Sequence, residues 1–109
     1  MTAADRLAQL QRIAQLLRDR DLMRLNAVSA RKRQTEALLG ALDKTQTGAV
    51  LDPIVAAQVV DRFGLWTTNR RILLNQQLAR DTVEWIALRS AAQRSFGQAE
   101  VLGKLSLKR

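Results

Sequence analysis

The stretch Thr45-Gln46-Thr47-Gly48-Ala49-Val50-Leu51-Asp52-Pro53 holds the one cluster of turn-forming residues in this chain of 109 residues. Residues on both sides of it are rich in Leu, Ala, Gln and Arg, which favour helix. Asp52 suits the N-cap of a helix, and Pro53 suits its first turn because the N–H that proline lacks would have no partner there. The predicted elements are a helix at about 3–44, a turn at 45–52 and a second helix at about 53–103.

Composition limits both the fold class and the chemistry of this protein. The chain has no His, no Cys and no Tyr, with five Gly and one Pro, so it predicts an all-α fold without disulfides. Catalysis would have to use Asp, Glu, Lys, Arg, Ser or Thr. Asp81 and Glu84 are the closest carboxylate pair, and we interpret them as solvated charges on an exposed helix face. No glycine-rich phosphate loop occurs, so we expect no enzyme activity, no cofactor and no metal.

Apolar residues in both predicted helices recur at intervals of three and four, the spacing of a coiled coil. In the first helix the expected contact positions are Leu7, Leu10, Ala14, Leu17, Leu25, Val28, Lys32, Thr35, Leu39 and Leu42. Two consecutive intervals of four meet at Asp21, which predicts a stutter there. In the second helix they are Ala56, Val59, Phe63, Trp66, Leu73 or Leu74, Leu78, Trp85, Leu88, Ala92, Phe96, Ala99 and Leu102. We expect the four aromatic residues of this stripe to form a core.

A connection as short as the predicted turn favours antiparallel packing of the two helices, so the expected fold is one helical-hairpin domain over residues 1–109. A turn centred near Gly48 would place Trp66 opposite Ala30 and Arg31, and Trp85 opposite the segment 11–13. Gly64 and its neighbours disfavour helix, so a kink or a break there is the alternative to a continuous second helix.

This register predicts that the C-terminal end of the second helix reaches the end of the first helix or passes beyond it. The candidate partner-binding residues in this apolar overhang are Phe96, Val101, Leu102 and Leu105. The alternative is that Gly97, Gly103 and Ser106 let the last turns fray. Further apolar residues lie off the predicted contact stripe, among them Leu16, Met23, Leu65, Ile72, Val83 and Ile86. Two helices cannot bury all of them, which indicates a homodimer or a larger protein partner.

The formal net charge of +8 favours an anionic partner. Cations concentrate at the middle of each predicted helix, and the candidate partner-binding residues among them are Arg24, Arg31, Arg33, Arg70 and Arg71. Such a belt could bind phosphates or an acidic protein surface. No aromatic residue and no nucleic-acid-binding motif accompanies it, so a solvated coiled-coil face is the alternative interpretation and nucleic acid is the less favoured partner.

The first residues and the distribution of charge along the chain predict where in the cell the protein is found. Asp5 and Arg6 stand where a signal peptide would have an apolar stretch, and charged residues interrupt every apolar run that could cross a membrane. We therefore expect a cytoplasmic protein without a membrane span.

Two segments carry a resemblance to a known family. They are Leu7-Ala8-Gln9-Leu10-Gln11-Arg12-Ile13-Ala14-Gln15-Leu16-Leu17 and Ala91-Ala92-Gln93-Arg94-Ser95-Phe96-Gly97-Gln98-Ala99-Glu100-Val101-Leu102. In a short, basic chain expected to form one long helical pair, they resemble the FliJ family of flagellar and type III secretion export proteins. The resemblance implies a non-enzymatic stalk or chaperone-escort protein that contacts an export ATPase, an export gate or chaperones. The alternatives are a dimeric helical-bundle adaptor and a basic nucleic-acid accessory protein.

Overall fold

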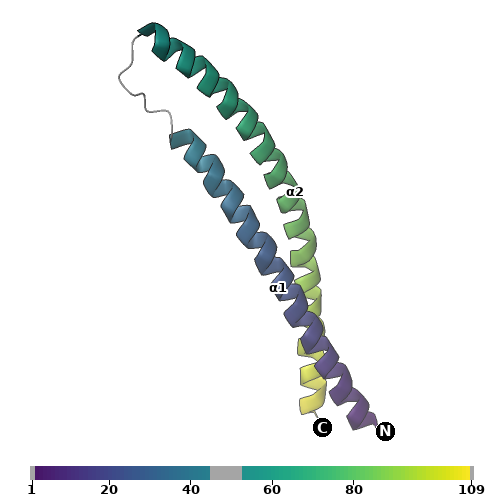
Figure 1. Ribbon diagram of the computed structural model, residues 1–109. Coiled ribbons are helices and arrows are strands. Elements are labelled where there is room, and N and C mark those ends of the chain that lie inside the picture. The colour runs from purple at the N-terminus through teal and green to yellow at the C-terminus, as the bar shows by residue number, and fades with distance from the viewer. Residues whose placement is uncertain (1, 45–52, 109) are drawn as a thin grey trace. The chain divides into compact units, whose positions relative to one another are not determined.

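The computed structural model describes residues 2–44 and 53–108, and these residues form an all-α structure. Helix α1 spans Ala3–Lys44 and helix α2 spans Pro53–Leu107 (Figure 1). The expected turn at 45–52, with its N-cap residue Asp52, lies outside the described residues. Helix α2 continues through Gly64 and past the expected end near residue 103, so neither the break nor fraying from Gly97 is present.

Helix α1 begins with a reciprocal cap. The Thr2 amide donates to Asp5 Oδ2 at 3.1 Å, and the Asp5 amide donates to Thr2 Oγ1 at 3.2 Å. The Thr2 amide is also the largest cause that lowers the pKa of the Asp5 carboxyl. The two side chains thus satisfy amide groups that the first helical turn leaves without intrahelical partners, which explains where α1 starts.

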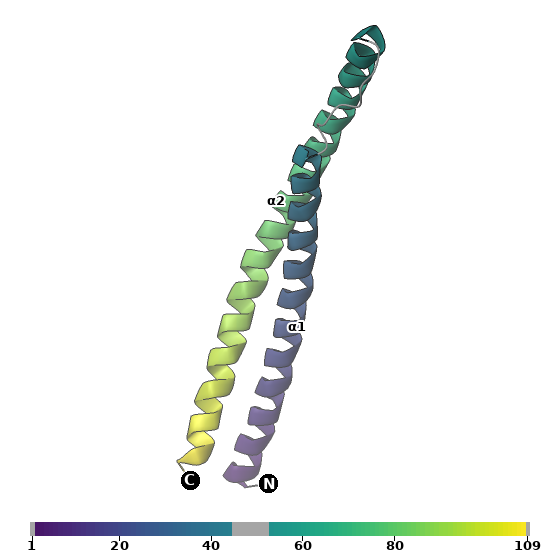
Figure 2. The same ribbon diagram turned by 90° about the vertical axis from the view of Figure 1, so that its left-hand side faces the viewer.

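The described contacts divide the chain into two compact units. Unit 1 consists of Met1–Ala30 and Val83–Arg109, and unit 2 consists of Arg31–Thr82. Each unit contains one segment of α1 and one of α2, and the residues that interact across them show that the segments run antiparallel (Figures 1 and 2). The fold class is therefore an antiparallel helical pair, as the sequence predicts.

The register of unit 1 differs from the expected one. Trp85 interacts with Ser29, and Ser95 interacts with Asp21, whereas the expected register places Trp85 opposite residues 11–13. Gly103 lies near the Gln11 side chain. The expectation assumed that the centre of the turn sets the register. In the structure the side chains that meet between the helices set it instead.

This register removes the predicted C-terminal overhang. In unit 1, Leu105 lines a small cavity together with Ala3, Leu7 and Leu10, so the C-terminal end of α2 lies beside the beginning of α1. In unit 2, the two helices end at different levels. There Asp43 pairs with Arg71 one residue before α1 ends, and the first turns of α2 extend past Lys44 (Figure 1).

The contact positions of α1, which we call the α1 seam, follow an uninterrupted alternation of threes and fours. They are Leu7, Gln11, Ala14, Arg18, Asp21, Leu25, Val28, Lys32, Thr35, Leu39 and Leu42, all buried or half-buried. The predicted stutter at Asp21 is therefore wrong. Leu10 and Leu17 precede Gln11 and Arg18 by one residue, which turns them about 100° away from the seam, and they are 52% and 37% exposed.

The corresponding α2 seam has the same spacing. It consists of Thr67, Arg71, Leu74, Leu78, Asp81, Trp85, Leu88, Ala92, Ser95, Ala99 and Leu102. The expected aromatic core is absent among these residues, because Trp66 and Phe96 lie one position beside Thr67 and Ser95 and are exposed. Phe63 stacks on Trp66 at a centroid distance of 5.8 Å outside the seam. Trp85 alone of the four aromatic residues is a seam residue.

Candidate interaction surfaces

A buried carboxylate lies at the centre of unit 1. Asp21 is on the α1 seam and is 4% exposed, and the Ser95 hydroxyl of the α2 seam donates a hydrogen bond to its Oδ2 atom. The Arg20 guanidinium donates to Asp21 Oδ1 through Nε at 3.2 Å and through Nη2 at 3.1 Å. Both carboxylate oxygens are therefore bonded, one across the helix pair and one within α1, which is how a buried charge is tolerated.

These bonds change the acidity of Asp21. The Ser95 hydroxyl is the largest cause that lowers the pKa of the Asp21 carboxyl, burial opposes it, and Arg20 and Arg24 lower the pKa further. Because the folded state holds the carboxylate more firmly than the unfolded chain does, Asp21 stabilises the fold above its ordinary pKa of 3.8. That stabilisation is lost as the pH falls through the lower pKa of the folded state.

We expect Ser95→Ala to lower the melting temperature at pH 7, because Asp21 then loses its hydrogen bond across the helix pair. The melting-temperature difference from the unsubstituted chain should shrink as the pH falls below 3.8, where the carboxyl is protonated in the unfolded state. Thermal unfolding followed by circular dichroism from pH 7 to about pH 2 measures it, with the exposed Ser90→Ala as control. A difference that is constant with pH would contradict this account.

The Trp85 side chain also joins the two helices of unit 1. Its Nε1 atom donates to Ser29 Oγ at 3.1 Å, and the Arg89 guanidinium lies 5.3 Å from the ring centroid. On the same side of unit 1, Arg18 lies 5.6 Å from the Phe96 ring centroid. Hydrogen bonds and cation–π contacts therefore hold much of this contact region together, rather than aliphatic packing alone.

Unit 2 contains a second buried carboxylate, and this one has fewer hydrogen bonds than Asp21. Asp81 on the α2 seam is 2% exposed. Its Oδ1 atom accepts from Gln77 Nε2 at 2.9 Å and lies 3.7 Å from Arg31 Nη2, while Oδ2 has no hydrogen-bond partner among the described residues. The Thr67 hydroxyl oxygen is likewise buried without such a partner. Both orphaned oxygens carry a desolvation cost that unit 2 does not recover.

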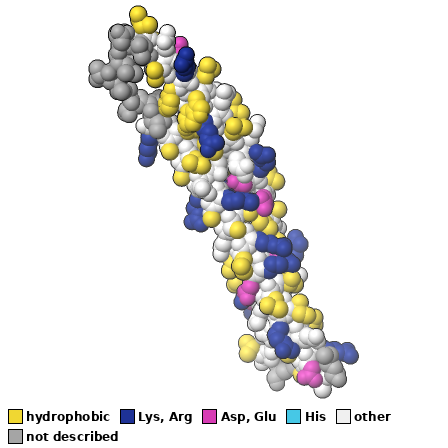
Figure 3. Space-filling model, viewed as in Figure 1, with side chains coloured by type: hydrophobic (Ala, Val, Ile, Leu, Met, Phe, Trp, Pro, Cys, Tyr) yellow, Lys and Arg dark blue, Asp and Glu magenta, His cyan; other side chains and the backbone are white. Residues whose placement is uncertain are grey.

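Many apolar side chains of the described residues lie outside the two seams. The buried hydrophobic residues are Ala14, Val28, Leu42, Leu74 and Ala99. Larger apolar side chains lie outside, including Leu16, Leu22, Met23, Leu38, Leu65, Ile72, Val83 and Ile86, as the expectation for off-seam residues requires. Figure 3 shows hydrophobic side chains interspersed with Lys and Arg on the visible face.

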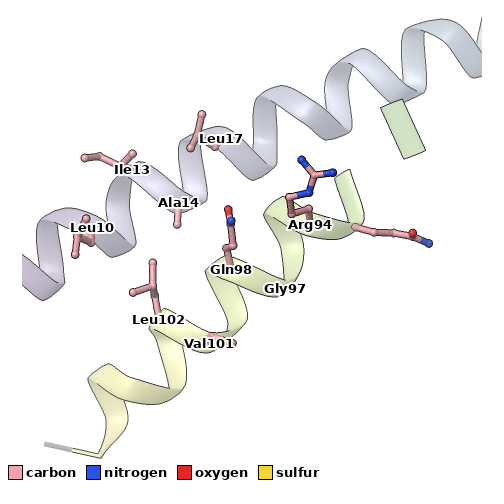
Figure 4. A pocket seen from close by; sticks show the side chains of 10 residues that line it. Leu10, Ile13, Ala14, Leu17, Arg94, Gly97, Gln98, Val101 and Leu102 are labelled. Carbon is pink, nitrogen blue, oxygen red and sulfur yellow. The ribbon is translucent and has the colours of Figure 1, made fainter. Parts of the chain in front are cut away.

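One of these apolar surfaces is hollowed. Helix α1 contributes Leu10, Ile13, Ala14 and Leu17, and helix α2 contributes Gln93, Arg94, Gly97, Gln98, Val101 and Leu102. We call this concavity the unit 1 groove; its volume is about 590 Å³. Figure 4 shows Ala14 pointing toward α2, and Gln98 and Leu102 pointing toward α1, at its floor. Leu10 also lines the cavity that contains Arg6 and Leu105, so the groove continues toward the start of α1.

The predicted basic residues do not share one environment. Arg24, in unit 1, is exposed and lies close enough to lower the pKa of Asp21. Arg33 and Arg70, in unit 2, are exposed. Arg31 and Arg71, in the same unit, face the carboxylates of Asp81 at 3.7 Å and Asp43 at 2.6 Å. Arg31 and Arg71 therefore have carboxylate partners within the chain.

The predicted apolar residues at the C-terminal end come together in unit 1, but not as an overhang. Val101 and Leu102 line the unit 1 groove, and Leu105 lines its continuation. Phe96 faces a different hollow, formed with Leu25, Arg89, Ala92, Gln93, Gly97 and Glu100. The sequence reasoning missed Leu10, Ile13 and Gly97 as wall residues, because it placed Leu10 on the seam and treated Gly97 as a fraying position.

The two residues of the predicted carboxylate pair, Asp81 and Glu84, differ in exposure. Glu84 is exposed, as expected, but Asp81 is buried, so the interpretation of both as solvated charges is wrong for Asp81. Within the described ranges, no group of three or more His, Cys, Asp or Glu could hold a metal ion. Neither α1 nor α2, over the residues described, is long and apolar enough to cross a membrane.

Comparison of the chain with protein-family models, with curated proteins and with solved structures found no match.

Proposed function

We propose that this chain is a non-enzymatic, cytoplasmic coiled-coil protein that acts by binding other proteins. The observation that supports it is the division of side chains between seam and surface. The seams contain Asp21, Asp81 and Ser95, whereas large Leu, Ile and Val side chains face outward. Burying one such aliphatic side chain contributes about 1.5–3 kcal/mol. A complex in which an apolar partner surface covers these side chains is therefore more stable than the chain with the side chains exposed to water.

The more specific form of the proposal follows the resemblance to the FliJ family. In that form the chain is a stalk or chaperone-escort component of flagellar or type III export and contacts an export ATPase. The pairing of Arg31 with Asp81 and of Arg71 with Asp43 favours a protein partner over nucleic acid, because these two cations already have carboxylate partners in the chain.

Affinity capture of the tagged full-length chain from its own cells, at low and high salt and after nuclease treatment, tests this function. Mass spectrometry should identify an export ATPase, a gate component or a chaperone that stays bound at high salt. A double variant with Arg33→Glu and Arg70→Glu, both at exposed positions, should retain that partner. Recovery of nucleoprotein alone, lost with nuclease or with this double variant, would overturn the proposal.

A further inference from the structure

The unit 1 groove has the form of a site for one helix. Between Ala3 and Leu17, its α1 wall covers about 20 Å at 1.5 Å per residue. Leu10, Ile13 and Leu17 line it from α1, Val101 and Leu102 line it from α2, and Leu10 joins the two parts of the groove. An amphipathic helix of about four turns presents apolar residues at the same intervals and binds such grooves in other proteins.

Gly97 leaves the α2 wall of the groove without a side chain at one position. It lies inside helix α2, where glycine costs about 1 kcal/mol relative to alanine. Its φ is not positive, and a Cβ atom built on it would meet nothing within 4 Å. Neither backbone conformation nor packing in unit 1 therefore requires a glycine, whereas a partner helix in the groove could approach the α2 backbone closely at this point.

Charge at the two ends of the groove indicates which helix would bind. Arg94 lines one end, and Arg6 lines the other. Neither forms an ion pair with any residue that the structure describes. A second copy of this chain would bring another formal charge of +8 to the groove, whereas carboxylates on the occupant would pair with both arginines.

From these observations we infer that the unit 1 groove binds an acidic amphipathic helix of a partner protein. The apolar side of that helix packs on Leu10, Ile13 and Val101, and carboxylates near its two ends face Arg6 and Arg94. This inference rests on the proposed protein-binding function and specifies the chemistry of the partner.

The test uses the purified full-length chain and two labelled 18-residue peptides. Both peptides carry Leu at alternating intervals of three and four; one has Glu at the flanking positions and the other has Lys. Fluorescence anisotropy at low ionic strength should show binding of the Glu peptide at least tenfold tighter, about 1.4 kcal/mol, than binding of the Lys peptide. Substitution of both Arg6 and Arg94 by Glu should reverse this preference.

Gly97→Leu fills the groove and should weaken binding of the Glu peptide by about tenfold or more. Gly64→Leu is the matched control, because Gly64 also lies within α2 with nothing within 4 Å of a built Cβ atom but belongs to unit 2. Circular dichroism should show that both variants stay helical, since leucine favours helix more than glycine does.

Three outcomes would overturn the inference: no binding of the Glu peptide, equal binding by Gly97→Leu and Gly64→Leu, or a chain dimer that Gly97→Leu dissociates. The last outcome would assign the groove to a second copy. The proposed function is tested separately, because its test is which proteins the chain captures from cells and not whether it binds the peptides. If Gly97→Leu still captures an export protein from cells, the function stands and the groove is not its site.

Discussion

Asp81→Leu is expected to raise the free energy of unfolding by about 1–3 kcal/mol, although it removes an ion pair. Asp81 is 2% exposed, its Oδ2 atom has no hydrogen-bond partner among the described residues, and Arg31 Nη2 is 3.7 Å from Oδ1. Attraction at that distance does not offset the cost of taking a carboxylate out of water. Leucine would instead add apolar contact to the α2 seam, as Leu74 and Leu78 do.

The state of Arg31 after the substitution decides the sign of this effect. Removing one partner of a buried ion pair is strongly destabilising when the other charge stays buried. The Arg31 side chain is 52% exposed, so water can solvate its charge when Asp81 is absent. The substitution therefore removes a buried charge without leaving another.

Chemical denaturation followed by circular dichroism measures this change, with two controls. Asp61→Leu carries the same change in helix propensity at an exposed position of α2 in unit 2 and should change the stability by less than about 0.5 kcal/mol. Asp81→Asn removes the charge but keeps a polar side chain, so its gain should be smaller than that of Asp81→Leu. A loss of stability in Asp81→Leu would mean that Gln77 and Arg31 stabilise the carboxylate more than burial penalises it.

Leu74→Ala is expected to lower the free energy of unfolding by about 2–4 kcal/mol, and Leu73→Ala by less than about 0.5 kcal/mol. The two leucines are adjacent in α2, but Leu74 is 6% exposed and Leu73 is 57% exposed. The substitution at Leu74 removes buried methyl groups and leaves a cavity in unit 2, whereas at Leu73 it removes atoms that water already contacts.

This pair controls for helix propensity, because the same leucine-to-alanine change occurs in the same helix one residue apart. The difference between the two free energies of unfolding therefore measures burial at the α2 seam. Guanidinium denaturation of both variants at one pH supplies it. Equal losses, or a larger loss in Leu73→Ala, would show that the seam contains Leu73 and that the register of unit 2 is different.

Local signals in the sequence were enough to identify the helices. Pro53 begins α2, and no other position outside the central stretch interrupts the helix-forming residues strongly enough to end a helix. Gly64 was the uncertain point, and α2 continues through it. One glycine costs about 1 kcal/mol, which the contacts along a long helix can offset.

The seam was less predictable, because the choice between neighbouring positions was made on hydrophobicity. Extending the strict spacing back from Leu25 reaches Asp21 and Arg18, but Leu17 was preferred because it is apolar. The same preference placed Phe96 on the seam instead of Ser95. The signal that favours the polar residues is the unbroken alternation of threes and fours, and following it would also have placed Asp81 in the interior.

By itself, the sequence determined the all-α class, the positions of the two helices and the excess of apolar side chains over what two helices can bury. These follow from backbone propensity and composition, which act within a few residues or over the whole chain. Tertiary structure alone decided the register, the burial of Asp21 and Asp81 and the walls of the unit 1 groove. These depend on which side chains from distant parts of the chain meet, and spacing within one helix does not contain that information.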